Sequence, residues 1–279
     1  MRQWRRGGLG VLSVVICRVW QGLIHPFGHS HKCLMRSYKG GKDMRTCVVL
    51  MCMFLLRVVH AQDLWPALDK PAKKIGGGQD DGALVVGIET YLSLPPIEGA
   101  KANAEAFYDY FVKTLGVPVE RARLLVDGDA TDAEIRTEAK RIASETKGTM
   151  WFVFIGHGAP DVKTKEGLLV GYDAKGDIEI IGQRSILQSE LFEILKKSKA
   201  KHIVVVLDAC FSGRTPEGEP LIKNVQPFTV VQEKGLDDER FVVLTATQKE
   251  QAASPLPGAE RPAFSYLVLG GIRGWADEN

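Results

Sequence analysis

The chain has 279 residues, and its 36 Lys and Arg against 34 Asp and Glu give a formal net charge of +2. The charge is unevenly spread, because residues 1–62 hold ten basic residues and one acidic residue, a net +9, whereas the remainder holds 26 basic and 33 acidic residues, a net −7. The small positive balance of the whole chain is therefore no evidence that the folded part binds nucleic acid or membranes, and no nucleic-acid partner is expected.

The basic segment 1–62 is predicted to be a leader. From Met44 it has a short basic start, an apolar run over 47–59 and a small residue, Ala61, before the expected cleavage point, which is the pattern of a secretory signal peptide. Arg57 interrupts the run, and the run is shorter than the ~20 apolar residues of a spanning helix. We expect a secreted or periplasmic protein with no stable membrane span in the mature chain; the alternative is a membrane-anchored protein.

The cysteine distribution singles out one residue. Four of the five cysteines lie in the leader, so the mature chain keeps Cys210 alone and cannot form an internal disulfide. A lone thiol in an exported protein suggests a reactive cysteine, and a buried, inert cysteine is the structural alternative.

The pattern after the leader predicts one α/β domain. Residues 63–82, with several Pro and Gly, are predicted to be a linker, and residues 83–279 a domain in which strands and helices alternate. This alternation predicts a three-layer α/β/α sandwich around a mostly parallel sheet. The predicted strands are 83–88, 123–126, 150–155, 202–207 and 241–245, and the predicted helices are 100–115, 131–146, 185–197 and 263–275. Runs at 168–172 and 177–181 predict a β-hairpin.

Two of the predicted strands lead into chemically competent residues. The strand at 150–155 runs into Gly156-His157-Gly158, and the strand at 202–207 runs into Asp208-Ala209-Cys210. The carboxyl ends of parallel strands share one edge of the sheet, so a thiol and an imidazole come within reach of each other, as a cysteine nucleophile and its base require. His202 begins the strand before Cys210 and lies roughly 26 Å from it at about 3.3 Å per residue, which leaves His157 as the base.

The neighbouring residues suggest supporting roles. The main-chain N–H groups of Gly158 and Cys210 would form an oxyanion hole, and Gly213 would let the chain turn away after the nucleophile. Asp208 lies two residues before Cys210, so its carboxylate could bind a cationic substrate side chain, or be a solvated or capping acid. The long Pro-containing segment 213–240 is a candidate active-site wall or cleavable linker.

At these residues the chain resembles a known family. A strand ending in His-Gly, paired with a later strand ending in Asp-Ala-Cys-Phe-Ser-Gly (208–213), is similar to the caspase-like peptidases, especially prokaryotic metacaspase-type domains. The resemblance runs from residue 83 onward and includes Thr245-Ala246-Thr247 before the last helix. It implies His157 and Cys210 as the catalytic dyad and the Gly158 and Cys210 amides as oxyanion donors.

The resemblance also implies a substrate preference. It places Asp208 in a pocket that selects Arg or Lys before the scissile bond, together with a residue near the start of the first helix. Relatives carry an Asp-Ala pair there, whereas this chain has Asn103-Ala104, and a neutral amide holds a cation less strongly.

We therefore predict an exported cysteine endopeptidase that acts on protein or peptide substrates and needs no cofactor or metal. Two alternatives stay open. One is a catalytically idle caspase-like interaction module, and the other is a different cysteine hydrolase or transferase on the same fold.

Overall fold

The computed structural model describes residues 65–68, 70, 72–213, 221, 237–246, 256, 258–275 and 277, all within the unit Val59–Asn279. The predicted leader, residues 1–62, lies outside the described residues. So do Thr247 and nearly all of the segment 214–236, in which Leu221 alone is described.

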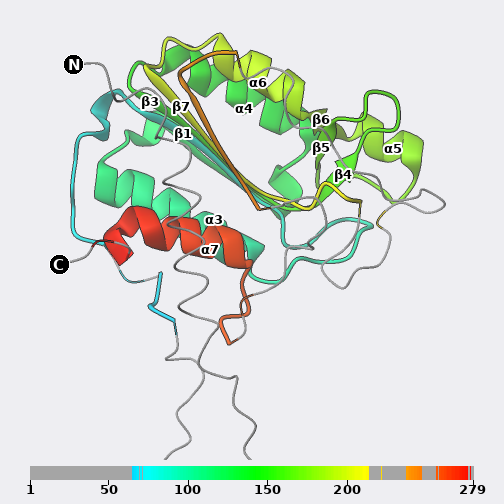
Figure 1. Cartoon of the computed structure of the whole chain (residues 1–279), viewed down its shortest axis with the longest axis horizontal. Coiled ribbons are helices and arrows are strands. Elements are labelled where there is room, and N and C mark those ends of the chain that lie inside the picture. Colours follow the sequence, from blue (N-terminus) through cyan, green and yellow to red (C-terminus); the bar gives the residue numbers. More distant parts are fainter. Residues whose placement is uncertain are drawn as a thin grey trace, which may run out of the picture. The chain divides into compact units, whose positions relative to one another are not determined.

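A five-stranded sheet forms the centre of the domain (Figure 1). Its strand order is β2-β1-β3-β7-β8, and every neighbouring pair is parallel. The strands are β1 Gly82–Gly87, β2 Ala122–Val126, β3 Thr149–Ile155, β7 His202–Asp208 and β8 Phe241–Thr245. All six residues of β1 are buried, which explains its unbroken run of small and apolar residues.

Helices cover both faces of this sheet. In Figure 1, α3 and α7 lie on one face and α4 and α6 on the other. Their bounds are α3 Ala100–Asp109, α4 Asp132–Glu145, α6 Gln188–Lys196 and α7 Ala263–Gly270. Two π-helical segments follow, η3 Tyr110–Leu115 after α3 and η6 Gly271–Trp275 after α7, and short 3-10 turns occur at η2 Gly78–Asp80, η4 Val119–Arg121 and η5 Asp127–Asp129. The predicted three-layer α/β/α sandwich with a mostly parallel sheet is confirmed.

The helix predicted at 131–146 is confirmed as α4, and it begins at a side-chain cap. Thr131 Oγ1 accepts the main-chain N–H of Glu134 at 3.2 Å, so the threonine caps the first turn. The apolar positions Ile135, Ala139 and Ile142 then follow at helical spacing and are fully buried against the sheet.

The predicted hairpin at 168–181 is wrong. A second, antiparallel sheet has the order β4-β5-β6, with β4 Gly158–Pro160, β5 Gly167–Val170 and β6 Ser185–Leu187. The residues predicted as the second hairpin strand form helix α5 Ile178–Gln183 instead. Asp177 Oδ1 accepts the N–H groups of Glu179 at 2.9 Å and Ile180 at 3.2 Å, and this cap starts a helix where β-branched residues had suggested a strand.

The described residues of the predicted linker pack onto the α3 and α7 layer. The side chain of Leu68 is buried there, and the ring of Trp65 meets that of Tyr266 edge-on, 6.5 Å between centroids. The Tyr266 hydroxyl donates to the carbonyl of Pro66 at 2.5 Å, and Arg273 donates to the carbonyls of Leu68 and Lys70. Among the residues that the structure describes, no helix has the length and apolar content needed to cross a bilayer.

Candidate active site

The pairing of β3 with β7 brings the His157 and Cys210 loops to one edge of the sheet. The last partners in the register are Ile155 and Asp208, and the N–H of Gly156 donates to the carbonyl of Asp208 at 3.1 Å. His157 and Cys210 each follow this last pair by two residues. Neighbouring strands lie about 4.8 Å apart, so both residues leave the sheet at the same place. His202 begins β7 at the opposite edge, opposite Thr149, as the sequence predicts.

Close packing between the two loops explains the glycine after His157. A Cβ atom on Gly158 would lie 2.9 Å from the carbonyl oxygen of Cys210 and 2.9 Å from the ring of Phe211. Unlike Gly213, whose φ is +73°, Gly158 has no left-handed backbone. The glycine is therefore needed for space rather than for backbone freedom, because its main chain rests directly on that of Cys210.

The β1–α3 connection holds His157 at two points. The imidazole Nε2 lies 2.8 Å from the carbonyl oxygen of Pro95, and the main-chain N–H of His157 donates to the hydroxyl of Tyr91 at 2.7 Å. A carbonyl oxygen can only accept, so Nε2 carries the proton in the neutral ring and Nδ1 keeps its lone pair. The side chain is 3% exposed, and a base at Nδ1 is therefore held in one tautomer and one orientation.

Cys210 is 8% exposed, and its Sγ lies 2.9 Å from the hydroxyl of Ser212, with either atom able to donate. It is a free cysteine. The hydrogen bond of the sulfur in this structure is thus to Ser212, the serine of the Asp-Ala-Cys-Phe-Ser-Gly segment. The close packing of the Gly158 position on the main chain of Cys210 brings the two loops together.

Asp208 and Asn103 belong to one buried polar cluster, which Ser265 joins. Asp208 Oδ2 accepts the main-chain N–H of Ser265 at 2.8 Å, and Asn103 Nδ2 donates to Ser265 Oγ at 2.8 Å and to the carbonyl of Pro262 at 3.0 Å. Asn103 and Ser265 are fully buried, and Asp208 is 3% exposed. The two residues that the sequence analysis assigned to one pocket therefore share a partner, on the first turn of α7.

Two oxygens of this cluster lack a donor. Among the described residues, neither Asp208 Oδ1 nor Asn103 Oδ1 has a hydrogen-bond partner. Burial raises the pKa of the Asp208 carboxyl above its ordinary value, and hydrogen bonds from Ser265 oppose that rise. A buried acceptor without a donor is costly, so the cluster has an unfilled requirement for hydrogen-bond donors.

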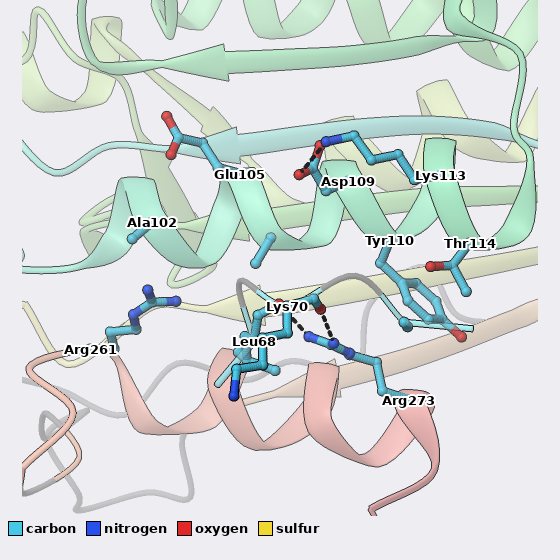
Figure 2. Close-up of a pocket in the computed structure, with 12 residues that line it drawn as sticks. Leu68, Lys70, Ala102, Glu105, Asp109, Tyr110, Lys113, Thr114, Arg261 and Arg273 are labelled. Carbon is cyan, nitrogen blue, oxygen red and sulfur yellow. Dashed lines mark hydrogen bonds and ion pairs between the residues drawn. The ribbon is translucent and has the colours of Figure 1, made fainter. Parts of the chain in front are cut away.

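A cavity of about 430 Å³ lies elsewhere on the domain, between α3, α7 and the segment beginning at Leu68 (Figure 2). Neither His157 nor Cys210 lines it. Its charged lining residues are Lys70, Glu105, Asp109, Lys113, Arg261 and Arg273. In the described ranges, no group of three or more His, Cys, Asp or Glu side chains is placed to hold a metal ion.

Comparisons with known proteins add a limited likeness. No protein-family model and no curated protein matches the sequence. Caspase-1 from Spodoptera frugiperda aligns over 75% of this chain and 75% of its own, with 14% identity and a TM-score of 0.46. A structural-genomics protein from Geobacter sulfurreducens aligns over 47% of this chain, with 17% identity and a TM-score of 0.37. The aligned part spans 50% of that protein's length.

Sequence reasoning missed three residues that support the site. Tyr91 and Pro95 lie in the β1–α3 connection, and Ser265 lies in the first turn of α7. The only signal that the sequence offers for them is their place in a connection or a first helical turn. The path of the connection decides which of its residues points toward the histidine. Hydrophobic periodicity does not specify that path.

Proposed function

We propose that the protein is a cysteine endopeptidase of the caspase-like, metacaspase type, with Cys210 as nucleophile and His157 as base. The observation that carries the proposal is the β3–β7 register, which ends at Ile155 and Asp208 and puts the main chain of Gly158 against that of Cys210. The fixed tautomer of His157 supports it, because a proton acceptor at Nδ1 is what activation of a thiol needs.

The chemistry follows from the groups at this edge. His157 takes the thiol proton, and the Cys210 sulfur attacks the peptide carbonyl carbon. The N–H groups of Gly158 and Cys210 donate to the oxyanion that forms, and His157 returns the proton to the leaving amine as the C–N bond breaks. Water then attacks the thioester, again with His157 as base, which releases the carboxylate product and restores the thiol. No step requires a metal or cofactor.

The buried cluster supports a preference for Arg or Lys before the scissile bond. Asp208 Oδ1 and Asn103 Oδ1 are acceptors without donors, and both could accept hydrogen bonds from a guanidinium or ammonium group. The bond to the Asp208 carboxylate would be charge-assisted, whereas the Asn103 oxygen is a neutral acceptor. A bound cation would also favour the ionised form of Asp208, which burial disfavours.

Export and self-processing complete the proposal. Cleavage of the leader after Ala61 would release the domain into a secreted or periplasmic location, and mass spectrometry should then find Gln62 or a near neighbour as the first residue. Arg214, Lys223 and Lys234 follow the nucleophile in the sequence, so an enzyme that prefers basic residues has candidate bonds within its own chain.

Two other functions make different predictions. An idle interaction module would keep its binding after loss of Cys210, whereas a different cysteine hydrolase would turn over small esters and leave peptides uncut. The free, buried thiol beside a histidine of fixed tautomer favours an enzyme over an idle module.

The test is cleavage of a mixed peptide library by the full chain. We expect cleavage after Arg or Lys by the wild type and none by Cys210→Ala or His157→Ala, with circular dichroism spectra that show both variants folded. Undiminished cleavage by Cys210→Ala would refute the mechanism, and cleavage after acidic residues would refute the pocket assignment alone.

A further inference from the structure

Tyr91 makes two contacts with His157 that the proposed mechanism does not use. Its hydroxyl oxygen accepts the main-chain N–H of His157 at 2.7 Å, and its ring lies 4.8 Å from the imidazole, centroid to centroid, at an angle of 43°. Tyr91 is 6% exposed, so both contacts are shielded from water. One side chain thus restrains the backbone and the ring of the same histidine.

The glycine before His157 is shaped by the same hydroxyl group. A Cβ atom on Gly156 would lie 2.6 Å from the Tyr91 hydroxyl oxygen. The oxygen therefore occupies the space that any larger residue at position 156 would need. This close approach fixes the distance between the end of β3 and the tyrosine.

The segment that carries Tyr91 is itself anchored. Asp127 Oδ1 accepts the N–H groups of Glu89 and Thr90, each at 2.9 Å, and the N–H of Leu92 donates to the carbonyl of Tyr172 at 3.1 Å. Tyr91 therefore sits between fixed points on both sides. These contacts hold Tyr91 in place independently of His157, so Tyr91 can in turn hold His157 in place.

We propose that Tyr91 is a positioning residue for His157, which it holds in the orientation that serves Cys210. The proposal rests on the catalytic role of His157 given above. The Pro95 carbonyl fixes the far nitrogen of the ring, and Tyr91 fixes the ring plane and the main chain behind it. Together they leave the imidazole little freedom to turn away from the thiol.

The variant Tyr91→Phe tests this, since it keeps the ring and removes the oxygen. We expect kcat for peptide cleavage to fall about tenfold with KM nearly unchanged, because Tyr91 is not among the proposed substrate contacts. Tyr110→Phe is the matched control. Tyr110 is 7% exposed and its hydroxyl donates to the carbonyl of Ile272 at 2.8 Å, on the far half of the α3 layer. This control should keep wild-type kcat.

Hydrogen exchange gives a readout that does not depend on peptidase activity. In Tyr91→Phe the amide of His157 should exchange at least tenfold faster, whereas the amide of Gly156, which donates to Asp208, should not change. Gly156→Ala should be less harmful to stability in the Tyr91→Phe background than in the wild type, because the atom it would strike is gone.

These readouts separate the two proposals. If His157 exchange is unchanged in Tyr91→Phe, or kcat falls no more than in Tyr110→Phe, the positioning role is wrong even if the wild type cleaves peptides. If exchange of the His157 amide rises while Cys210→Ala cleaves as well as the wild type, Tyr91 still holds His157 but the endopeptidase mechanism is wrong.

Discussion

Gly158 rests on Cys210 so closely that a Cβ atom on the glycine would lie 2.9 Å from the cysteine carbonyl oxygen and 3.0 Å from its carbonyl carbon. The neighbouring atoms are backbone and the ring of Phe211, which cannot swing aside as the end of a long side chain could. The spacing of the two loops is therefore set at this residue, and with it the geometry of the proposed oxyanion hole.

Gly158→Ala should separate the loops and lower kcat by roughly 100-fold or more, since loss of one oxyanion donor costs about 10²–10³ in rate. Peptide cleavage kinetics would measure this. Gly182→Ala is the matched control, because nothing lies within 4 Å of a Cβ there and the residue is exposed in α5. A Gly158→Ala enzyme with wild-type kcat would place the oxyanion hole elsewhere.

The Asp208 carboxyl should make stability depend on pH. Burial raises its pKa in the folded protein, so the folded state binds the proton more tightly than the unfolded state. The stability that protonation contributes is complete below the ordinary value of 3.8 and is lost as the pH rises through the folded pKa. Thermal unfolding of the wild type and of Asp208→Asn should show this dependence. Measured against the wild type, the variant should be more stable at neutral pH than it is near pH 4. A difference that is independent of pH would contradict this account.

Asn103→Asp should destabilise the protein by about 2–6 kcal/mol at neutral pH, since each of the two buried partners left without its hydrogen bond costs about 1–3 kcal/mol. A carboxylate has no N–H to give to the carbonyl of Pro262, and it would join Asp208 as a second acid in the same buried cluster. A carboxylate at this position would hold a cation more strongly than the neutral amide does, and the structure adds this cost in stability. Urea unfolding measures it, and an unchanged midpoint would show that the Asn103 amide is not needed as a donor.

A cut in the segment 214–236 should leave the domain assembled. Arg240 donates to the carbonyls of Lys196, Ser198 and Ala200, and β8 stays paired with β7. Wild-type protein that has cut itself after Arg214, Lys223 or Lys234 should elute from a sizing column as one species and separate only in denaturant. A preparation that cleaves peptides while its own chain stays intact would contradict self-processing, and fragments that separate without denaturant would contradict the assembled state.

The sequence predicted the layers of the fold well where the hydrophobic pattern decides which segments form strands and helices. The buried runs of β1, β3 and β7 and the capped start of α4 are confirmed because burial on both faces and a side-chain cap are local signals. The hairpin failed because Asp177 caps a helix that residues with strand propensity then form. Short segments of this kind are decided by a side-chain cap that periodicity does not reveal.

The site was predictable only in part, for a related reason. His157 and Cys210 follow strands, so the parallel sheet brings them to one edge whatever the connections do. Tyr91, Pro95 and Ser265 act through the path of loops and helix starts, and their partners are 66, 62 and 57 residues away in the chain. No local pattern encodes contacts over such separations.

The most direct test of the central claim is covalent labelling by a peptidyl chloromethyl ketone that carries Arg next to the reactive group. We predict that mass spectrometry will find the adduct on Cys210 rather than on the four leader cysteines, and that peptide cleavage will fall in step with labelling. The analogue with Asp in place of Arg should react more slowly, and His157→Ala should react little with either. Full labelling of Cys210 with undiminished peptide cleavage would contradict the account.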